Sequence, residues 1–177
     1  MDKTFLIRWF GPFFDREDER NWEREQKEKF NLYMICGQKK YAKSMEHYYI
    51  GQTIRDVYKR FSDRNHHIND LQRINEIWIG TFANKKPTKT DINLAEKMLI
   101  SCMDVEIGEV AMLNDTNKYL PSENVYLISE WYQRSRNIWI KKSRTSPASI
   151  IPDVIAYRIN DNNEPILYAA NKLKKVL

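Results

Sequence analysis

The chain has 177 residues, a length that favours one domain (residues 1–177) able to bury a core without disulfides or metals. Hydrophobic residues make up 42% and aromatic residues 12%, which excludes an intrinsically disordered chain. Lys and Arg number 29 against 24 acidic residues, a net charge of +5. This surplus favours a polyanionic partner such as nucleic acid, although many unrelated proteins share so modest a value.

Two cysteines, Cys36 and Cys102, lie within apolar runs and not in paired metal-binding motifs. They are typical of buried free thiols in a reducing compartment. No stretch approaches the roughly 20 apolar residues that a membrane-spanning helix needs, and the N-terminus has no signal-peptide pattern. We therefore expect a cytoplasmic protein without a membrane partner.

The first 29 residues predict an N-terminal addition to the core. Residues 5–14 are aromatic and apolar around Gly11 and Pro12, as in a short strand and turn. Residues 15–29 are almost wholly charged, and pairs such as Glu23 with Lys27 favour a helix. Such a helix is either a solvated connector or an arm that binds a partner.

Residues 32–36 and 47–50 are two runs of strand-forming residues that predict a β-hairpin. The segment between them is polar and carries Lys39, Lys40 and Lys43. These lysines are placed either to contact a phosphate backbone or to form an ordinary solvated loop.

A helix with one buried face is predicted from Ile54 to Phe61, and Ile68, Leu71 and Ile74 continue a helical spacing. Residues 76–82 are typical of a buried strand. A second helix over residues 92–103 is expected to be capped by Thr90 or Asp91.

Residues 120–177 predict a C-terminal accessory region that ends in a β-hairpin over residues 154–169. Its basic run lies close to three aromatic residues, Trp131, Tyr132 and Trp139. The run consists of Arg134, Arg136, Lys141, Lys142 and Arg144. It suits contact with phosphates and bases, or else forms the exposed edge of an accessory sheet.

Four residues suggest chemistry together more than they do singly. Tyr33 and Tyr49 come from adjacent predicted strands, so their hydroxyls can converge, although core tyrosines are common. Arg60, on the helix after the hairpin, can bind a phosphate or form a surface ion pair. Glu96, at the edge of a buried helical stripe, can bind Mg²⁺ or pair with a lysine.

In this order the elements resemble the GIY-YIG nuclease family. The matching residues are Asn31-Leu32-Tyr33, Tyr49-Ile50-Gly51, Arg60, Glu96 and Asn114. The resemblance covers about residues 30–115 and implies an α/β (α+β) fold: a small, mainly antiparallel three-stranded sheet flanked by helices. The N-terminal and C-terminal β segments would be additions to this core.

The sequence departs from the family pattern at three residue positions, and its loop between the two tyrosine motifs is longer than in compact members. Asn31 stands where glycine is usual, and Arg60 falls one position late. Arg64 occupies the place of a histidine that often follows the arginine. His67 lies on the same helical face and is the nearest substitute, whereas a continuing helix would point His66 elsewhere.

The resemblance implies catalysis by Tyr33, Tyr49, Arg60 and His67, with Glu96 holding one Mg²⁺ or Mn²⁺ and with Asn114 and Arg64 supporting the site. Either tyrosine would deprotonate the attacking water, while Arg60 neutralises the phosphate. The resemblance thus implies a metal-dependent DNA endonuclease of the restriction or homing type, with a homodimer on DNA as one assembly. The alternatives are a GIY-YIG-like module that only binds nucleic acid or protein, and an unrelated small α/β domain.

Overall fold

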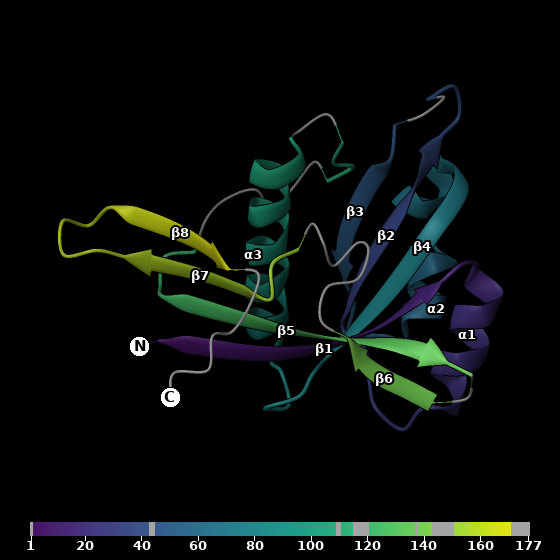
Figure 1. The fold of residues 1–177 in the computed structure, drawn as a ribbon, viewed down its shortest axis with the longest axis horizontal. Helices are drawn as coiled ribbons and strands as arrows, with labels where there is room; N and C mark the ends of the chain where they lie inside the picture. The colour runs from purple at the N-terminus through teal and green to yellow at the C-terminus, as the bar shows by residue number, and fades with distance from the viewer. Residues whose placement is uncertain are drawn as a thin grey trace.

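A computed structural model describes residues 2–42, 45–108, 111–114, 121–136, 138–142 and 151–170. The strands are β1 (Lys3–Phe13), β2 (Leu32–Lys39), β3 (His47–Gln52), β4 (Leu71–Phe82), β5 (Val125–Ser135), β6 (Ile138–Lys142), β7 (Val154–Ile159) and β8 (Pro165–Ala170). The helices are α1 (Arg16–Glu25), α2 (Val57–Phe61), the 3₁₀ helix η1 (His67–Asp70) and α3 (Lys89–Ile107). Within the described residues the eight strands form one mixed sheet in the order β3-β2-β4-β1-β5-β7-β8, with β6 paired to β5 (Figure 1).

The predicted fold class is wrong, because the sheet is not a small three-stranded one flanked by helices. Strands β3, β2 and β4 pair antiparallel, but the sheet does not end there, because β4 also pairs antiparallel with β1. β1 in turn pairs in parallel with β5 along Lys3 to Phe10. The segment expected to be a short N-terminal strand is therefore a central strand of the sheet. A parallel partner so distant in the chain leaves no mark on local periodicity.

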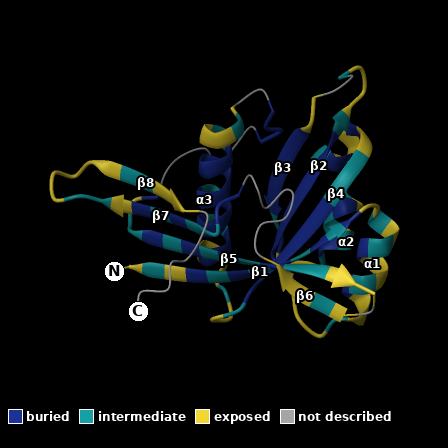
Figure 2. Cartoon of the chain, viewed as in Figure 1, coloured by how far each residue is buried: buried dark blue, intermediate teal, exposed yellow. Residues whose placement is uncertain are grey.

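The sheet buries a separate hydrophobic cluster on each face. One cluster joins Trp9 and Trp78 to Leu99 of α3. The other joins Tyr33 and Ile77 to Phe61 of α2, and Trp22 of α1 packs against it. Helix α3 therefore covers one face of the sheet and α1 and α2 cover the other. Figure 2 shows the buried stretches running through α3 and the β2–β3 hairpin, with the outer surface of α1 exposed.

Both predicted hairpins are confirmed. β2 pairs antiparallel with β3 from Leu32 opposite Gln52 to Gly37 opposite His47. β7 pairs antiparallel with β8. Cys36 and Cys102 are both free and buried, as the sequence predicts.

The helix predicted after β3 is shorter than its spacing indicated. Ile54 is 65% exposed, and α2 begins only at Val57 and ends at Phe61. The expected continuation through Ile68 and Leu71 is wrong, because η1 is followed at once by β4. β4 finds strand partners on both sides, β1 and β2, and this pairing overrides the local helical spacing.

Helix α3 starts three residues earlier than predicted. Thr88 is its N-cap: the hydroxyl accepts a hydrogen bond from the Asp91 N–H, and the Asp91 carboxylate accepts one from the Thr88 N–H. This reciprocal capping box satisfies two backbone donors that would otherwise lack partners. Within the described residues, no helix is long and apolar enough to span a bilayer.

Candidate functional site

The two predicted tyrosines meet on the sheet face that α2 covers. Tyr33 lies opposite Gly51 and Tyr49 lies opposite Ile35, so the tyrosines are diagonal neighbours across β2 and β3. Side chains two residues apart on a strand share a face, which sets both rings on one side of the sheet. Their ring centroids are 6.0 Å apart.

Gly51 makes room for the ring of Tyr33. A Cβ atom at this position would lie 2.3 Å from the Tyr33 hydroxyl oxygen. The tyrosine ring therefore lies directly over the glycine backbone. This contact explains why glycine stands two residues after Tyr49.

His66 is the closest polar partner of Tyr33. Its ring is 2% exposed, and its Nε2 atom lies 2.8 Å from the Tyr33 hydroxyl oxygen. Its Nδ1 atom accepts a hydrogen bond from the Ile68 N–H. Burial, followed by the charge of Arg60, lowers the pKa of His66 to about 4. The ring is therefore neutral at pH 7, carries its proton on Nε2 and donates it to the tyrosine oxygen.

The expectation that His66 points away from the site is wrong. It assumed a continuous helix, but α2 ends at Phe61, and the chain turns before η1 begins at His67. His67, the residue chosen from the sequence, is half-buried, and its ring centroid lies 4.8 Å from that of Tyr49. Its Nδ1 atom lies 3.1 Å from an Asp70 carboxylate oxygen. The two histidines thus flank the tyrosine pair.

Arg60 reaches the tyrosine pair from α2. Its positive charge opposes the effect of burial on the pKa of both Tyr33 and Tyr49. The same guanidinium is paired with Asp63, which also binds Arg55. Arg60 therefore makes the ion pair considered from the sequence and faces the tyrosines as well.

Helix α2 is fixed in place by a carboxylate from another helix. The Asp56 side chain at its N-cap position makes no capping hydrogen bond. Instead, the two carboxylate oxygens of Glu23 on α1 accept the N–H groups of Val57 and Tyr58, at 2.8 and 2.9 Å. Glu23 is thus a buried cap that orients the short helix carrying Arg60.

Glu96 approaches the tyrosines from α3. It is 6% exposed, and its Oε2 atom accepts a hydrogen bond of 2.8 Å from the Gln52 side-chain amide. Gln52 is the last residue of β3 and also donates to Asn93. Burial and then the charge of Glu96 raise the pKa of Tyr49. Glu96 and Tyr49 therefore share one electrostatic environment at the β3 edge.

Asn114 and Arg64, expected to support the site, have different surroundings. The Asn114 amide accepts from the Ile50 N–H at 3.0 Å and donates to the Ile50 carbonyl at 2.7 Å. It thereby completes the hydrogen bonding of β3 between Tyr49 and Gly51. The side chain of Arg64 is exposed, and its carbonyl accepts from Asn69.

The predicted nucleic-acid contacts do not form one surface. Lys39 and Lys40 lie where β2 turns toward β3, at the top of Figure 1, whereas the β5–β6 hairpin lies at the lower right. On that hairpin Arg134 is paired with Asp18 and Lys141 with Glu130. Arg136 lies in the turn, and Lys142 is exposed. Lys43 and Arg144 lie outside the described residues.

The three aromatic residues near the basic run, Trp131, Tyr132 and Trp139, pack against aromatic residues of β1 and α1. Trp131 is 1% exposed and stacks on Trp9, with ring centroids 5.5 Å apart. Trp139 packs against Trp22, and Tyr132 stacks on Phe10. The idea that Trp131 reads bases is therefore wrong, because its ring is not accessible.

Sequence reasoning missed Gln52 and the function of Asn31. Gln52 follows Ile50 at strand spacing, which sets it on the α3 face; this was a usable signal. Asn31 donates its side-chain amide to the Thr53 carbonyl and accepts the Thr53 N–H on its own carbonyl. Asn31 thus ties the two ends of the hairpin together. No signal in the sequence alone predicts this bond.

Comparison of the chain with protein-family models, with curated proteins and with solved structures gave no significant match.

Proposed function

We propose that this chain is a metal-dependent endonuclease that hydrolyses DNA phosphodiester bonds. The observation that supports this most is the convergence of Tyr33, Tyr49, Arg60, His66 and Glu96 at the β3 edge. A guanidinium, two phenols, an imidazole and a carboxylate are the group types that phosphoryl hydrolysis uses. The proposal rests on this grouping and on the sequence resemblance; the topology of the sheet does not support it.

In this proposal Arg60 binds the non-bridging oxygens of the scissile phosphate. Its guanidinium opposes the negative charge that grows as water adds to phosphorus and the bond to the leaving oxygen breaks. The ion pair with Asp63 holds the guanidinium, and Glu23 holds its helix. One proton of the attacking water ends on the leaving oxygen.

Tyr49 is the tyrosine that we assign to the attacking water. Tyr33 is wholly buried and already accepts a hydrogen bond from His66, whereas Tyr49 is 9% exposed and lies beside the Glu96 charge. Because burial raises the pKa of both phenols, each is protonated at pH 7 in the protein alone. Tyr49 therefore orients the water by hydrogen bonding, and Tyr33 keeps Tyr49 in place.

The metal that the proposal needs fits a site with one carboxylate. Among the described residues, no three His, Cys, Asp or Glu side chains come together as a closed cage. Mg²⁺ commonly keeps several waters and binds through one or two carboxylates together with substrate phosphate oxygens. Glu96 would hold Mg²⁺ or Mn²⁺ in this way, with Gln52 orienting its carboxylate. When bound, the ion supplies positive charge to the phosphate.

Plasmid cleavage tests the proposal. Supercoiled DNA is incubated with the protein and Mg²⁺, and parallel reactions contain EDTA or the Glu96→Ala variant. Glu106→Ala is the matched control, since Glu106 is an exposed carboxylate on the same helix. We expect cutting only with Mg²⁺ and with Glu96 present. Cutting that persists in Glu96→Ala at the wild-type rate would remove Glu96 from the mechanism.

The second candidate is a module that binds nucleic acid or protein without cleavage. Two observations favour it: the Glu96 carboxylate is already bonded to Gln52, and both tyrosines are held in their neutral form. This reading predicts salt-sensitive DNA binding and no strand cutting with Mg²⁺ or Mn²⁺. On either reading, the free thiols lead us to propose the cytoplasm as the compartment.

A further inference from the structure

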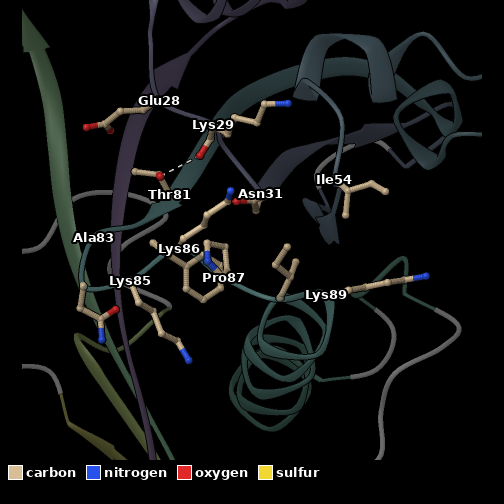
Figure 3. Close-up of a pocket in the computed structure, with 13 residues that line it drawn as sticks. Glu28, Lys29, Asn31, Ile54, Thr81, Ala83, Lys85, Lys86, Pro87 and Lys89 are labelled. Carbon is tan, nitrogen blue, oxygen red and sulfur yellow. Dashed lines mark hydrogen bonds between the residues drawn. The ribbon is translucent and has the colours of Figure 1, made fainter.

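A large lysine-lined cavity lies beside the candidate site. It has a volume of about 580 Å³ and forms between the end of β4, the segment after β3 and the first turn of α3 (Figure 3). We call it the lysine pocket; its lining includes Lys29, Lys85, Lys86, Lys89, Ile54 and Pro87. Its volume is within the range of about 300–1,000 Å³ typical of small-molecule sites.

The lining of the lysine pocket carries more positive than negative charge, since Glu28 is the one carboxylate among described lining residues that include Lys29, Lys85, Lys86 and Lys89. Lys85 is paired with Asp91 and lies over the Phe5 ring, so its ammonium group already has partners within the protein. Lys86 and Lys89 are exposed, and neither forms an ion pair with any of the residues that the structure describes. Their ammonium groups are therefore available to an anion.

The pocket wall also offers apolar surface. Ile54 is 65% exposed after the end of β3, and Pro87 and Ile92 line the cavity with it. Figure 3 shows Ile54 and Lys89 on one side of the cavity and Lys85, Lys86 and Pro87 on the other. A ligand held here meets apolar groups and ammonium groups together. A nucleotide matches both kinds of group, since its flat base can lie against apolar side chains and its phosphate is an anion that ammonium groups can bind.

Helix α3 connects the lysine pocket to the candidate site, since Lys89 lines the pocket and Glu96 lies about two turns further along the helix. Lys89, Asn93 and Glu96 are spaced at i, i+4 and i+7, which sets them along one stripe of the helix. The rise of an α-helix separates the backbones of Lys89 and Glu96 by about 10 Å. Gln52 bonds both Asn93 and Glu96, and Ile54 follows two residues later.

We infer that the lysine pocket binds one nucleotide of the substrate strand, next to the phosphate that meets Arg60 and Glu96. Its base lies against Ile54 and Pro87, and its phosphate contacts Lys86 and Lys89. This inference rests on the proposed function, because it takes the bound strand to be the one that is cut. The contacts with Lys86, Lys89, Ile54 and Pro87 would determine where the strand is held.

Binding in EDTA tests the pocket apart from cleavage. The affinity for fluorescent single-stranded DNA is measured by anisotropy for the wild type, Lys86→Glu and Lys89→Glu. Arg158→Glu is the control, because Arg158 is an exposed arginine on β7 with the same change of charge. We expect each lysine variant to bind at least about tenfold more weakly at low salt. The slope of log affinity against log salt should also fall by about 0.7 per lost phosphate contact.

The base contact needs its own measurement. One abasic site is moved along the same strand, and we expect binding by the wild type to weaken at one position. In Ile54→Asp this dependence on position should disappear, and because Ile54 is exposed the variant should keep the wild-type unfolding midpoint. Wild-type affinity in both lysine variants would overturn the inference. So would an absence of DNA binding, or stronger binding of polyglutamate than of DNA.

The two proposals fail in different ways. Binding that depends on Lys86 and Lys89, without cutting under Mg²⁺ or Mn²⁺, keeps the pocket and removes the nuclease. Cutting that is unchanged in Lys86→Glu and Lys89→Glu keeps the nuclease and removes the pocket.

Discussion

At the scale of single residues, the site is organised around the buried hydroxyl of Tyr33. His66 donates to it, Gly51 lies beneath its ring, and Arg60 faces it from α2. Each contact depends on a small detail: a tautomer, a missing Cβ or a helix end. Substitutions of single residues therefore test these contacts most directly.

Gly51→Ala should disturb Tyr33 directly. The new Cβ would be 2.3 Å from the hydroxyl oxygen, so the ring must shift within a packed core. We expect a loss of about 1–3 kcal/mol in the free energy of unfolding, measured with urea, and a large loss of cleavage. Gly108→Ala is the control. Gly108 has a φ of 81° and open space around it, so alanine there should reduce stability without affecting cleavage.

His66 should make stability depend on pH. Its pKa is about 4 in the folded protein and near 6.5 in the unfolded chain, so only the unfolded chain gains a proton between these values. The His66 contribution to the free energy of unfolding should therefore fall by about 1.4 kcal/mol per unit as the pH drops from 6.5 toward 4. Urea unfolding at several pH values should show this slope as the difference in the free energy of unfolding between the wild type and His66→Gln, because the raised pKa of Glu19 contributes a slope of opposite sign above about pH 4.5. An unchanged slope in His66→Gln, or its loss in His67→Gln, would contradict the assignment.

At the scale of elements, α1 carries two buried carboxyl groups, Glu19 and Glu23, and Glu23 supports α2. Burial and the neighbouring Glu23 charge raise the pKa of Glu19 to about 9. Glu23 caps α2 with hydrogen bonds to Val57 and Tyr58. The helix that carries Arg60 thus depends on a segment that, from its sequence, resembled a solvated connector.

Glu19→Gln should stabilise the protein at neutral and alkaline pH. Between about pH 4.5 and 9 the folded chain keeps a proton on Glu19 that the unfolded chain releases, so this group lowers stability as the pH rises. Glutamine removes that dependence, and thermal unfolding at pH 8 should show a higher midpoint for the variant. Glu23→Ala should have the opposite effect, because two helix N–H groups lose their acceptor. A lower midpoint for Glu19→Gln at pH 8 would show that its proton is not held as described.

Elements were predictable where their pattern was local. The alternation of β2 and β3, the turn of the β7–β8 hairpin and the helix around Glu96 all follow from nearby residues. The helix predicted from Ile54 to Ile74 was largely wrong. β4 forms because it pairs with strands on both sides, and a carboxylate from α1 caps α2. His66 was misplaced for the same reason. Tertiary contacts determine where the helix ends.

At the scale of the whole molecule, β1 connects the candidate site to the C-terminal strands. It pairs with β4 on one side and β5 on the other, so both hydrophobic clusters lie against one continuous sheet. The sequence indicated one domain but not this sheet. The β1–β5 pairing joins two segments that are far apart in the chain, and the sequence pattern of neither segment indicates the other as its partner.

A continuous sheet should unfold in one step. Urea unfolding followed by tryptophan fluorescence and by far-ultraviolet circular dichroism should give coincident transitions. Trp9, Trp78 and Trp131 lie in the cluster on the α3 face, so fluorescence reports on the centre of the sheet. Two separated transitions would mean that the C-terminal strands fold apart from the site.

The central claim is that Tyr49, Arg60 and Glu96 act as one catalytic site. The most direct test is the single-turnover rate of plasmid cleavage with Mg²⁺ for Tyr49→Phe, Glu96→Gln and the double variant. Groups that act together give losses that do not multiply. We predict that each single variant loses at least about 100-fold in rate and that the double variant is little slower. Wild-type rates in the single variants, or losses that multiply in the double variant, would contradict the claim.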